Sequence, residues 1–135
     1  MASHAGHSAD DFVPWPHPSP VLDALGSLLA HRTDPLRAGF EVTDAKVNAR
    51  GFLHAGTVAT MADVTIGHAL AALSGVPYVT VNLTCDLLGR AELGDWVEIV
   101  VDPTKERGRL AAGRAELRTG TRLVATAHAL FLPAG

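Results

Sequence analysis

Residues 56–73 read GTVATMADVTIGHALAAL, and this stretch decides the fold. Successive residues of an α-helix turn by about 100°, so that Val58, Met61 and Ile66 point in different directions around the axis. Many of the remaining positions are Ala, Gly or Thr, which allow other backbones to approach closely. Because Gly75 and Pro77 then stop the pattern, we predict one long helix that is buried on nearly all sides.

After Pro77 the apolar residues change from helical spacing to alternation, which predicts a half-buried strand over residues 79–87. Its predicted apolar face carries Val79, Val81, Leu83, Cys85 and Leu87, and its polar face carries Thr80, Asn82, Thr84 and Asp86. Alternation also occurs at residues 96–102, 110–118 and 123–132, with short turns between them. We therefore expect four consecutive strands that pair as an antiparallel meander.

The residues before the long helix predict a shorter helix and one strand. Leucines at helical spacing over residues 21–30 indicate a short amphipathic helix. Phe40 and Val42 indicate a strand that extends less clearly to Val47, before a loop at residues 48–53. One strand, a buried helix and four strands pack most economically as an α+β fold, in which a curved antiparallel sheet wraps around one long central helix.

Residues 1–20 are rich in His, Ser and Pro, a composition that disfavours regular helix. We predict a flexible or partly ordered N-terminal arm over these residues and a single folded domain over residues 21–135. Phe12 and Trp15 are large apolar side chains, so we expect them to anchor part of the arm on the body or on a neighbouring subunit.

Length, charge and cysteine content exclude several classes of protein. A chain of 135 residues with 47% hydrophobic and 19% charged residues fits one globular domain. The net charge is −3 and no basic block is present, so we expect no nucleic-acid partner. Cys85 is the only cysteine, which excludes an intramolecular disulfide and fits a reducing, cytoplasmic compartment. No stretch resembles a signal peptide or approaches the roughly 20 uninterrupted apolar residues of a membrane span, so we expect a soluble protein.

Asp63 is the one carboxylate on the predicted helix, and it lies on the side of Ile66 and Leu70. Burying an ionised carboxylate without partners is costly, so this side chain must be hydrogen-bonded, paired, protonated or in contact with a cavity. A structural aspartate bonded to neighbouring backbone fits this pattern as well as a functional one does.

The loop that enters the helix, residues 48–56, reads NARGFLHAG. Small residues at a helix start, here Ala55 and Gly56, leave the first N–H groups open to hold a substrate or a developing negative oxygen. Asn48 and His54 would add side-chain donors near the same point. Each also has a simpler interpretation, since Asn often shapes a loop and His often caps a helix or bonds locally.

The stretch NARGFLHAGTVATMAD at residues 48–63 resembles the signature of hotdog-fold acyl-CoA thioesterases of the phenylacetate-pathway type. In that signature an Asn and a Gly precede His-Gly-Gly, and an acidic residue follows on the helix. The similarity continues through VTVNL at residues 79–83, LGDWV at 93–97 and LVATA at 123–127, and covers roughly residue 36 to the C-terminus. The resemblance implies a hotdog fold, in agreement with the predicted order of elements, and hydrolysis of an acyl-CoA thioester.

The resemblance also implies roles for individual residues. The acidic helix residue, Asp63, acts as nucleophile or general base, and the amide N–H after the motif His, that of Ala55, polarises the carbonyl oxygen. Asn48 orients the substrate or the attacking water, and the hydroxyl of Thr80 assists the water or the carboxylate. His54 supports the loop and the leaving sulfur. Such hydrolysis requires no metal or redox cofactor.

Two residues depart from the family pattern. Ala55 replaces the first Gly of the usual pair, and Thr80 stands where Ser is often found. A backbone N–H survives the change from Gly to Ala, so the donor can persist, although the added methyl group would be strained if that Gly is left-handed.

Other chemistry-bearing residues carry weaker signals. Cys85 lies on the predicted apolar face and is interpreted as core. His4 and His7 have a spacing that could chelate, but without further ligands we predict no metal site. Arg90, near a turn, is a candidate contact for the phosphates of coenzyme A. The chain has no G-x-S-x-G elbow, P-loop or dinucleotide fingerprint, which removes the α/β-hydrolase and nucleotide-binding interpretations.

A single sheet has edges to cover, so we expect a homo-oligomer in which two copies join edge to edge. In the resembled family the active site spans the dimer interface, which implies a homodimer or homotetramer whose oxyanion donor and carboxylate come from different subunits. Two alternative functions stay open at this point. One is a non-catalytic module that binds acyl-CoA or acyl-carrier protein, and the other, which fits the pattern of His54 and Asp63 less well, is a hotdog dehydratase.

Overall fold

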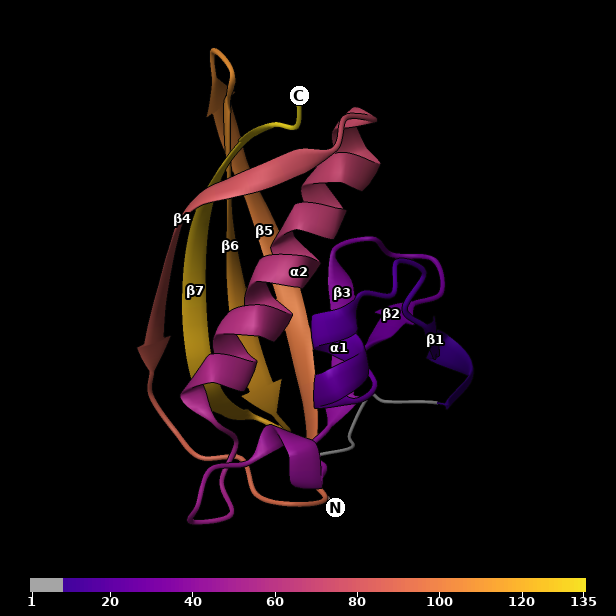
Figure 1. Cartoon of the computed structure of the whole chain (residues 1–135), viewed down its shortest axis with the longest axis vertical. Helices are drawn as coiled ribbons and strands as arrows, with labels where there is room; N and C mark the ends of the chain where they lie inside the picture. Colours follow the sequence, from indigo (N-terminus) through magenta and orange to yellow (C-terminus); the bar gives the residue numbers. More distant parts are fainter. Residues whose placement is uncertain (1–8) are drawn as a thin grey trace.

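The computed structural model describes the backbone of residues 9–135 and the side chains of residues 10–104 and 108–135. His4, His7 and the first eight residues of the predicted arm therefore lie outside the described part. One long helix lies across the face of a seven-stranded antiparallel sheet that curves around it (Figure 1). This arrangement is the predicted α+β architecture.

The helices and strands have the following bounds. In chain order they are η2 (Ala9–Asp11), β1 (Phe12–Pro14), α1 (Pro20–Leu25), β2 (Leu29–His31), β3 (Arg37–Glu41), η3 (Asp44–Lys46), α2 (Ala55–Ser74), β4 (Tyr78–Leu87), β5 (Trp96–Arg107), β6 (Leu110–Thr119) and β7 (Arg122–Pro133). The long helix and the four strands after it lie where the sequence predicts them, whereas three short strands replace the single strand predicted before it.

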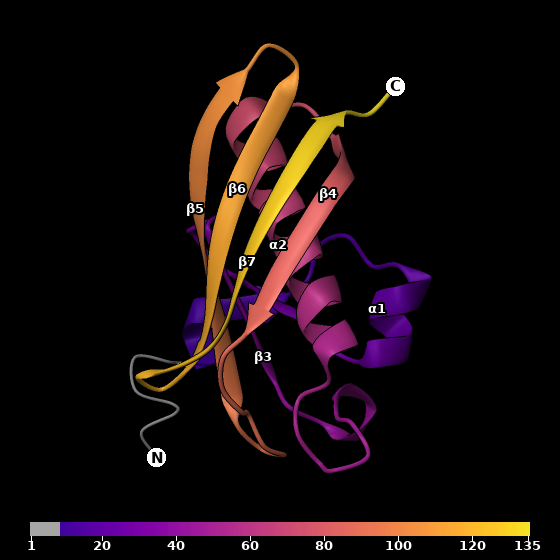
Figure 2. The same ribbon diagram turned by 90° about the vertical axis from the view of Figure 1, so that its left-hand side faces the viewer.

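The strand order is β1-β2-β3-β5-β6-β7-β4, so the predicted meander of four consecutive strands is wrong in one place. β5, β6 and β7 form a meander, but β4 pairs with β7 at the far edge of the sheet, as Figure 2 shows. The connection between β4 and β5, residues 88–95, is longer than the two to five residues that join hairpin partners. It passes the ends of β7 and β6 before the chain enters β5, which runs antiparallel to β4 and lies three positions away in the sheet.

One face of α2 packs against the sheet. Val58, Met61 and Ile66 are no more than 2% exposed and belong to the core together with residues of β3, β5, β6 and β7. A Cβ on Gly113 of β6 would lie only 2.7 Å from Cγ2 of Ile66, so a glycine there allows the helix to approach the strand closely. Gly75, with φ of 77°, ends the helix in the left-handed conformation expected of a C-terminal glycine.

The opposite face of α2 is half-exposed in the single chain. Its residues are Ala59, Thr60, Asp63, Val64, Gly67 and His68. The prediction that the helix is buried on nearly all sides is therefore wrong for the chain by itself, because the sheet covers only one side. Within residues 9–135, α2 is also the one helix that is long and apolar enough to cross a bilayer, by length and composition alone, and it forms the centre of this fold.

The elements before α2 differ from the prediction in their lengths. The helix predicted over residues 21–30 stops at Leu25, because Gly26 leaves the helical conformation with φ of 90° and the chain enters β2. The strand predicted to reach Val47 stops at Glu41, and η3 follows. Ala45 and Val47 alternate like strand residues over too short a stretch to distinguish the two structures.

Part of the predicted arm belongs to the sheet. β1 pairs with β2, with Val13 opposite Ala30. Phe12 is buried, and its ring meets the rings of Trp96 and His31 edge-on at centroid distances of 5.1 and 5.3 Å. Phe12 thus anchors the described part of the arm on the body.

A bulge at Val81 interrupts β4. Before the bulge Thr80 lies opposite Phe131, and after it Leu83 lies opposite Ala129. Phe131 and Ala129 are buried, and directly opposed residues share a face, so Thr80 and Leu83 both face α2. The predicted faces, with Thr80 on the polar side and Val81 on the apolar side, are therefore wrong, because one extra residue reverses the alternation.

Candidate active site

The start of α2 is held by hydrogen bonds within its first turn and to Lys46. His54 is the N-cap residue, and its Nδ1 accepts a bond of 2.8 Å from the backbone N–H of Gly56. Behind it, the carbonyl of Lys46 accepts from the His54 N–H at 2.9 Å and from the Thr57 hydroxyl at 3.1 Å. Ala55 is exposed and helical, so the change from Gly brings no left-handed strain, and its N–H belongs to the first helical turn, which has no intrahelical acceptor.

The loop before the helix is shaped by Asn48. Its Oδ1 accepts hydrogen bonds from the backbone N–H groups of Arg50 at 2.9 Å and Phe52 at 3.1 Å. Gly51, with φ of 85°, provides the left-handed residue that this tight loop needs. The guanidinium carbon of Arg90 lies 4.4 Å from the centroid of the Phe52 ring. Asn48 thus stabilises the loop that precedes α2, and Arg90 packs against this loop.

Asp63 has a specific partner on the sheet. The hydroxyl of Thr80 donates a hydrogen bond of 2.5 Å to Oδ1 of Asp63. The contact depends on the bulge at Val81, which turns Thr80 toward the helix. Asp63 itself is half-buried on the side of α2 that the sheet does not cover. The structure thus supports neither a fully buried carboxylate nor one bonded only to its own backbone.

Asp63 and Thr80 line a pocket of about 290 Å³. Its other walls come from α2, α1, β4, β7 and the arm: Trp15, His17, Ser19, Leu22, Val64, Gly67, His68, Tyr78 and Phe131. Gly67 has no side chain to fill the pocket, and a Cβ there would lie only 3.3 Å from the Phe131 ring. Most of these walls are apolar or aromatic, so the carboxylate faces a space suited to an apolar ligand.

The pKa shifts of His68 and Cys85, which lie near Asp63, both favour the uncharged form of the side chain. Burial lowers the pKa of His68, and His17 lowers it further, so the His68 ring is neutral near physiological pH. Burial also raises the pKa of the Cys85 thiol, with smaller contributions from the charges of Asp86 and Asp63. Cys85 packs half-buried against the core, as predicted, and remains a thiol.

Within one chain the two groups of predicted residues do not meet. Asn48, His54, Ala55, Gly56 and Arg90 belong to the loop and the start of α2, whereas Asp63 and Thr80 lie further along. Asp63 follows Ala55 by eight residues, and a helix rises about 1.5 Å per residue, so the two are about 12 Å apart along the axis. None of the five residues in the first group lines the pocket beside Asp63.

The edge of the sheet next to this pocket is open. β4 pairs with β7 on one side, and no strand of residues 9–135 pairs with its other side. Apolar side chains along and just after it are about half-exposed: Val79, Val81, Leu87 and Leu88. A long edge strand with exposed apolar residues is a surface on which another strand can add.

The sequence did not indicate several pocket residues. Tyr78 begins β4 and faces the pocket because of its register, and His68 lies about one helical turn beyond Asp63. Trp15 was expected to anchor the arm, and its ring packs on His68 with a centroid distance of 4.6 Å. No group of three or more His, Cys, Asp or Glu side chains in the described part of the chain is arranged to hold a metal ion.

Comparison with known proteins places this geometry in a family. The model of the thioesterase superfamily matches residues 50–126, more than half of the chain. A Pseudomonas aeruginosa protein named as an esterase is 36% identical over 127 residues, which cover 90% of this chain and 94% of that protein.

Solved structures show the same fold at lower identity. A variant of the phenylacetic acid degradation protein PaaI of Thermus thermophilus superposes with a TM-score of 0.75 at 23% identity, over 86% of this chain and 100% of that one. A hypothetical thioesterase of Streptococcus pneumoniae, determined with coenzyme A, superposes with a TM-score of 0.70 at 16% identity, over 94% and 91% of the two chains.

Proposed function

The chain belongs to the thioesterase superfamily, and from that premise we propose that it hydrolyses an acyl-CoA thioester to a carboxylic acid and free CoA. The observation that carries the proposal is the contact between Asp63 and Thr80, which gives a mostly apolar pocket one oriented carboxylate. Thioester hydrolysis needs a group that attacks the carbonyl carbon or activates water, and a donor for the negative oxygen that develops.

Asp63 supplies the first of these groups by one of two routes. As a general base it takes a proton from water, whose oxygen attacks the carbonyl carbon. As a nucleophile its own oxygen attacks and forms an anhydride, which water then cleaves. In both routes the tetrahedral oxyanion collapses, the C–S bond breaks, and the CoA thiolate leaves and takes up a proton. The Thr80 hydroxyl donates to Oδ1 and so holds the carboxylate in one orientation.

The oxyanion donor in this proposal is the Ala55 N–H of a second subunit. A carbonyl bond is only about 1.2 Å long, so no single carbonyl can meet both Ala55 and Asp63 when they are about 12 Å apart on one helix. The open edge of β4 supports a homodimer in which two such edges meet, and two dimers could pair into a homotetramer. In that arrangement Asn48 and His54 would orient the substrate from the partner's loop.

The CoA part of the substrate is assigned to the same loop. Arg90 is exposed beside the helix start, where its guanidinium can meet a phosphate, and the positive end of the α2 dipole favours negative oxygens there. Gly56 would bind substrate only as part of this helix start, because its own N–H already donates to His54. The coenzyme A bound to the Streptococcus pneumoniae structure supports a substrate of this type. The reaction as proposed uses protein groups and water and requires no cofactor. We assign the enzyme to the cytoplasm, because its single cysteine fits a reducing compartment.

The test is to replace Asp63 with Asn, which keeps the shape of the side chain and removes its charge. We expect turnover of a panel of aromatic and aliphatic acyl-CoA substrates to fall by about 10²–10⁴-fold, the usual contribution of a positioned acid or base. Unchanged turnover by the folded variant would reject the role of Asp63. If the unaltered protein binds acyl-CoA tightly without hydrolysing any member of the panel, it is a binding module and the enzymatic proposal is wrong.

A further inference from the structure

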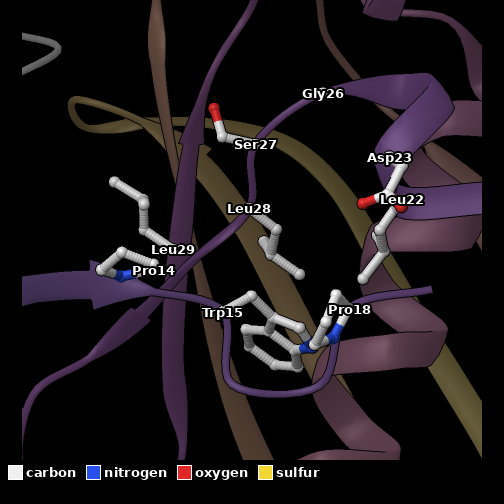
Figure 3. A pocket seen from close by; sticks show the side chains of 9 residues that line it. All are labelled: Pro14, Trp15, Pro18, Leu22, Asp23, Gly26, Ser27, Leu28 and Leu29. Atoms are coloured by element: carbon white, nitrogen blue, oxygen red, sulfur yellow. The ribbon is translucent and has the colours of Figure 1, made fainter.

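Two pockets of this chain share a wall formed by the arm. The pocket beside Asp63 has a volume of about 290 Å³, and a second pocket of about 370 Å³ lies between β1, α1 and β2. Trp15 and Leu22 line both pockets, so the two are neighbours. Figure 3 shows the second pocket, with the Trp15 indole next to Pro18 and below Leu28.

The first pocket has the chemistry of an acyl site rather than a CoA site. Asp63 is its one acidic lining residue, and no Lys or Arg of the described side chains lines it. Phosphate groups would find no positive partner there, whereas Val64, Tyr78 and Phe131 offer apolar surface. Since the thioester carbonyl must lie against Asp63 for the proposed reaction, the acyl group attached to that carbonyl extends along these walls.

The Trp15 wall is held firmly in place. Pro14, just before it, pairs with Leu29 in the sheet, and soon after it Ser19 caps α1 by accepting a bond of 3.4 Å from the Leu22 N–H. Proline at positions 14, 16 and 18 restricts the backbone around the indole. The ring then packs on His68, whose lowered pKa keeps it uncharged. The indole is therefore a preformed wall and needs no ligand to order it.

We propose that Trp15 sets the length of the acyl group that this enzyme accepts, by closing the first pocket against the second. The inference rests on the proposed acyl-CoA hydrolysis and names its substrate class, which is short aliphatic or small aromatic acyl groups. Trp15 forms the wall of the first pocket on the side of the second, so it stops an acyl chain that runs from Asp63 in that direction. Without the indole, the pockets of about 290 and 370 Å³ would together offer about 660 Å³, enough for a much longer chain.

The experiment compares acyl-CoA substrates from acetyl to dodecanoyl, with phenylacetyl, in the full-length protein and in Trp15→Ala. We expect the unaltered enzyme to prefer the short members. In Trp15→Ala the ratio of kcat/KM for decanoyl-CoA to that for butyryl-CoA should rise about tenfold or more, since each methylene placed in an apolar pocket can contribute that much. Trp15→Phe, which keeps a ring, should fall between the two.

A second substitution distinguishes a joined pocket from a loosened one. Leu29 lines only the second pocket, so Leu29→Phe in the Trp15→Ala background should refill that space and reverse the gain for long chains. Leu29→Phe alone should leave the profile of the unaltered enzyme as it is. The inference is overturned if the length profile is the same in Trp15→Ala as in the unaltered enzyme, or if Leu29→Phe does not reverse the gain.

Binding measurements keep this inference separate from the proposed function. Affinities of the same CoA thioesters for Asp63→Asn protein, with and without Trp15→Ala, report on the pocket without turnover. If no thioester is hydrolysed by the unaltered protein, the proposed function fails, and the binding profile still decides the role of Trp15. If Trp15→Ala does not fold, the graded shift expected for Trp15→Phe, checked against its thermal unfolding, provides the same decision.

Discussion

The start and the middle of α2 are built by different kinds of contact. At the start, the side-chain hydrogen bonds of Asn48 and His54 join residues two to four positions apart in the chain. In the middle, Asp63 meets Thr80, which is 17 residues away, and His68 meets Trp15 from the arm. The start is exposed and offers backbone N–H groups, whereas the middle is half-buried and offers a carboxylate beside an apolar pocket.

This difference suggests that the start and the middle of α2 have separate roles. A backbone amide needs only a well-formed helix start to be aimed correctly, and local bonds can provide that. An oriented carboxylate next to an acyl group needs the walls of a pocket. Here those walls come from elements that are distant from α2 in the sequence. The predictions below break one end or the other, and we expect their effects on activity and stability to separate accordingly.

Besides Asp63→Asn, removing the amide at the start of α2 should have the largest effect. Ala55 is the first helical residue, a position where proline is well tolerated, and His54 before it has the extended backbone that precedes proline. Ala55→Pro therefore deletes one N–H and keeps the helix. We expect kcat to fall by about 10²–10³-fold, as for loss of one oxyanion donor, with thermal stability unchanged. Ala55→Gly keeps the N–H and should stay active. Full activity in Ala55→Pro would show that the Ala55 N–H is not the oxyanion donor.

Loosening the carboxylate in the middle should have the next largest effect. Thr80→Val keeps the size and shape of the side chain but removes the hydroxyl that donates to Asp63. Because a hydrogen bond to a charged group contributes about 1.5–3 kcal/mol, we expect kcat to fall by about 10–100-fold. Thr80→Ser should restore most of the activity. If Thr80→Val is as active as the unaltered enzyme, the contact has no role in catalysis.

The cap at the start should affect stability more than chemistry. His54→Ala removes the acceptor for the Gly56 N–H, and loss of an N-cap costs about 0.5–2 kcal/mol of unfolding free energy. His54→Asn keeps an acceptor and should recover that stability in urea unfolding. If turnover recovers along with stability, His54 acts only as a cap. A stable but inactive His54→Asn would instead support contact of His54 with the leaving sulfur.

The smallest effect should come from protonation of His68 in the middle of α2. Burial, followed by His17, lowers the pKa of His68 in the folded chain, so below the ordinary value of 6.5 the unfolded chain binds the proton more readily. The unfolding free energy should therefore fall as the pH drops through 6.5 toward the folded pKa. Urea unfolding from about pH 7.5 to about pH 5 should show a weaker decline in His68→Asn. An identical decline in both proteins would contradict this.

The same division explains what could be predicted from the sequence. The helix over residues 56–73 and the four strands after it follow from periodicity, because helical spacing and alternation distinguish the two kinds of element. The loop and cap residues are close in sequence, so their proximity in space could be predicted without knowledge of the fold. The family resemblance of residues 48–63 is confirmed by the thioesterase superfamily match.

What could not be predicted depends on long-range contacts. One extra residue at Val81 turns Thr80 toward Asp63, and no local pattern signals that bulge. Trp15 joins the pocket because β1 pairs with β2, two three-residue strands too short to show a period. The strand order, in which β4 joins the far edge beside β7, also depends on pairing between segments that are distant in the sequence. The roles of Asp63, Asn48, His54, Ala55, Thr80, Gly56 and Arg90 in catalysis and binding remain predictions.

The central claim is that one site takes its amide from one subunit and its carboxylate from another. The most direct test mixes Ala55→Pro and Asp63→Asn chains, by co-expression or by refolding together, and measures acyl-CoA hydrolysis. In a two-fold symmetric dimer, random mixing gives every mixed pair one intact site, so activity should return to about a quarter of that of the unaltered enzyme. Activity no higher than the average of the two variants alone would contradict the claim.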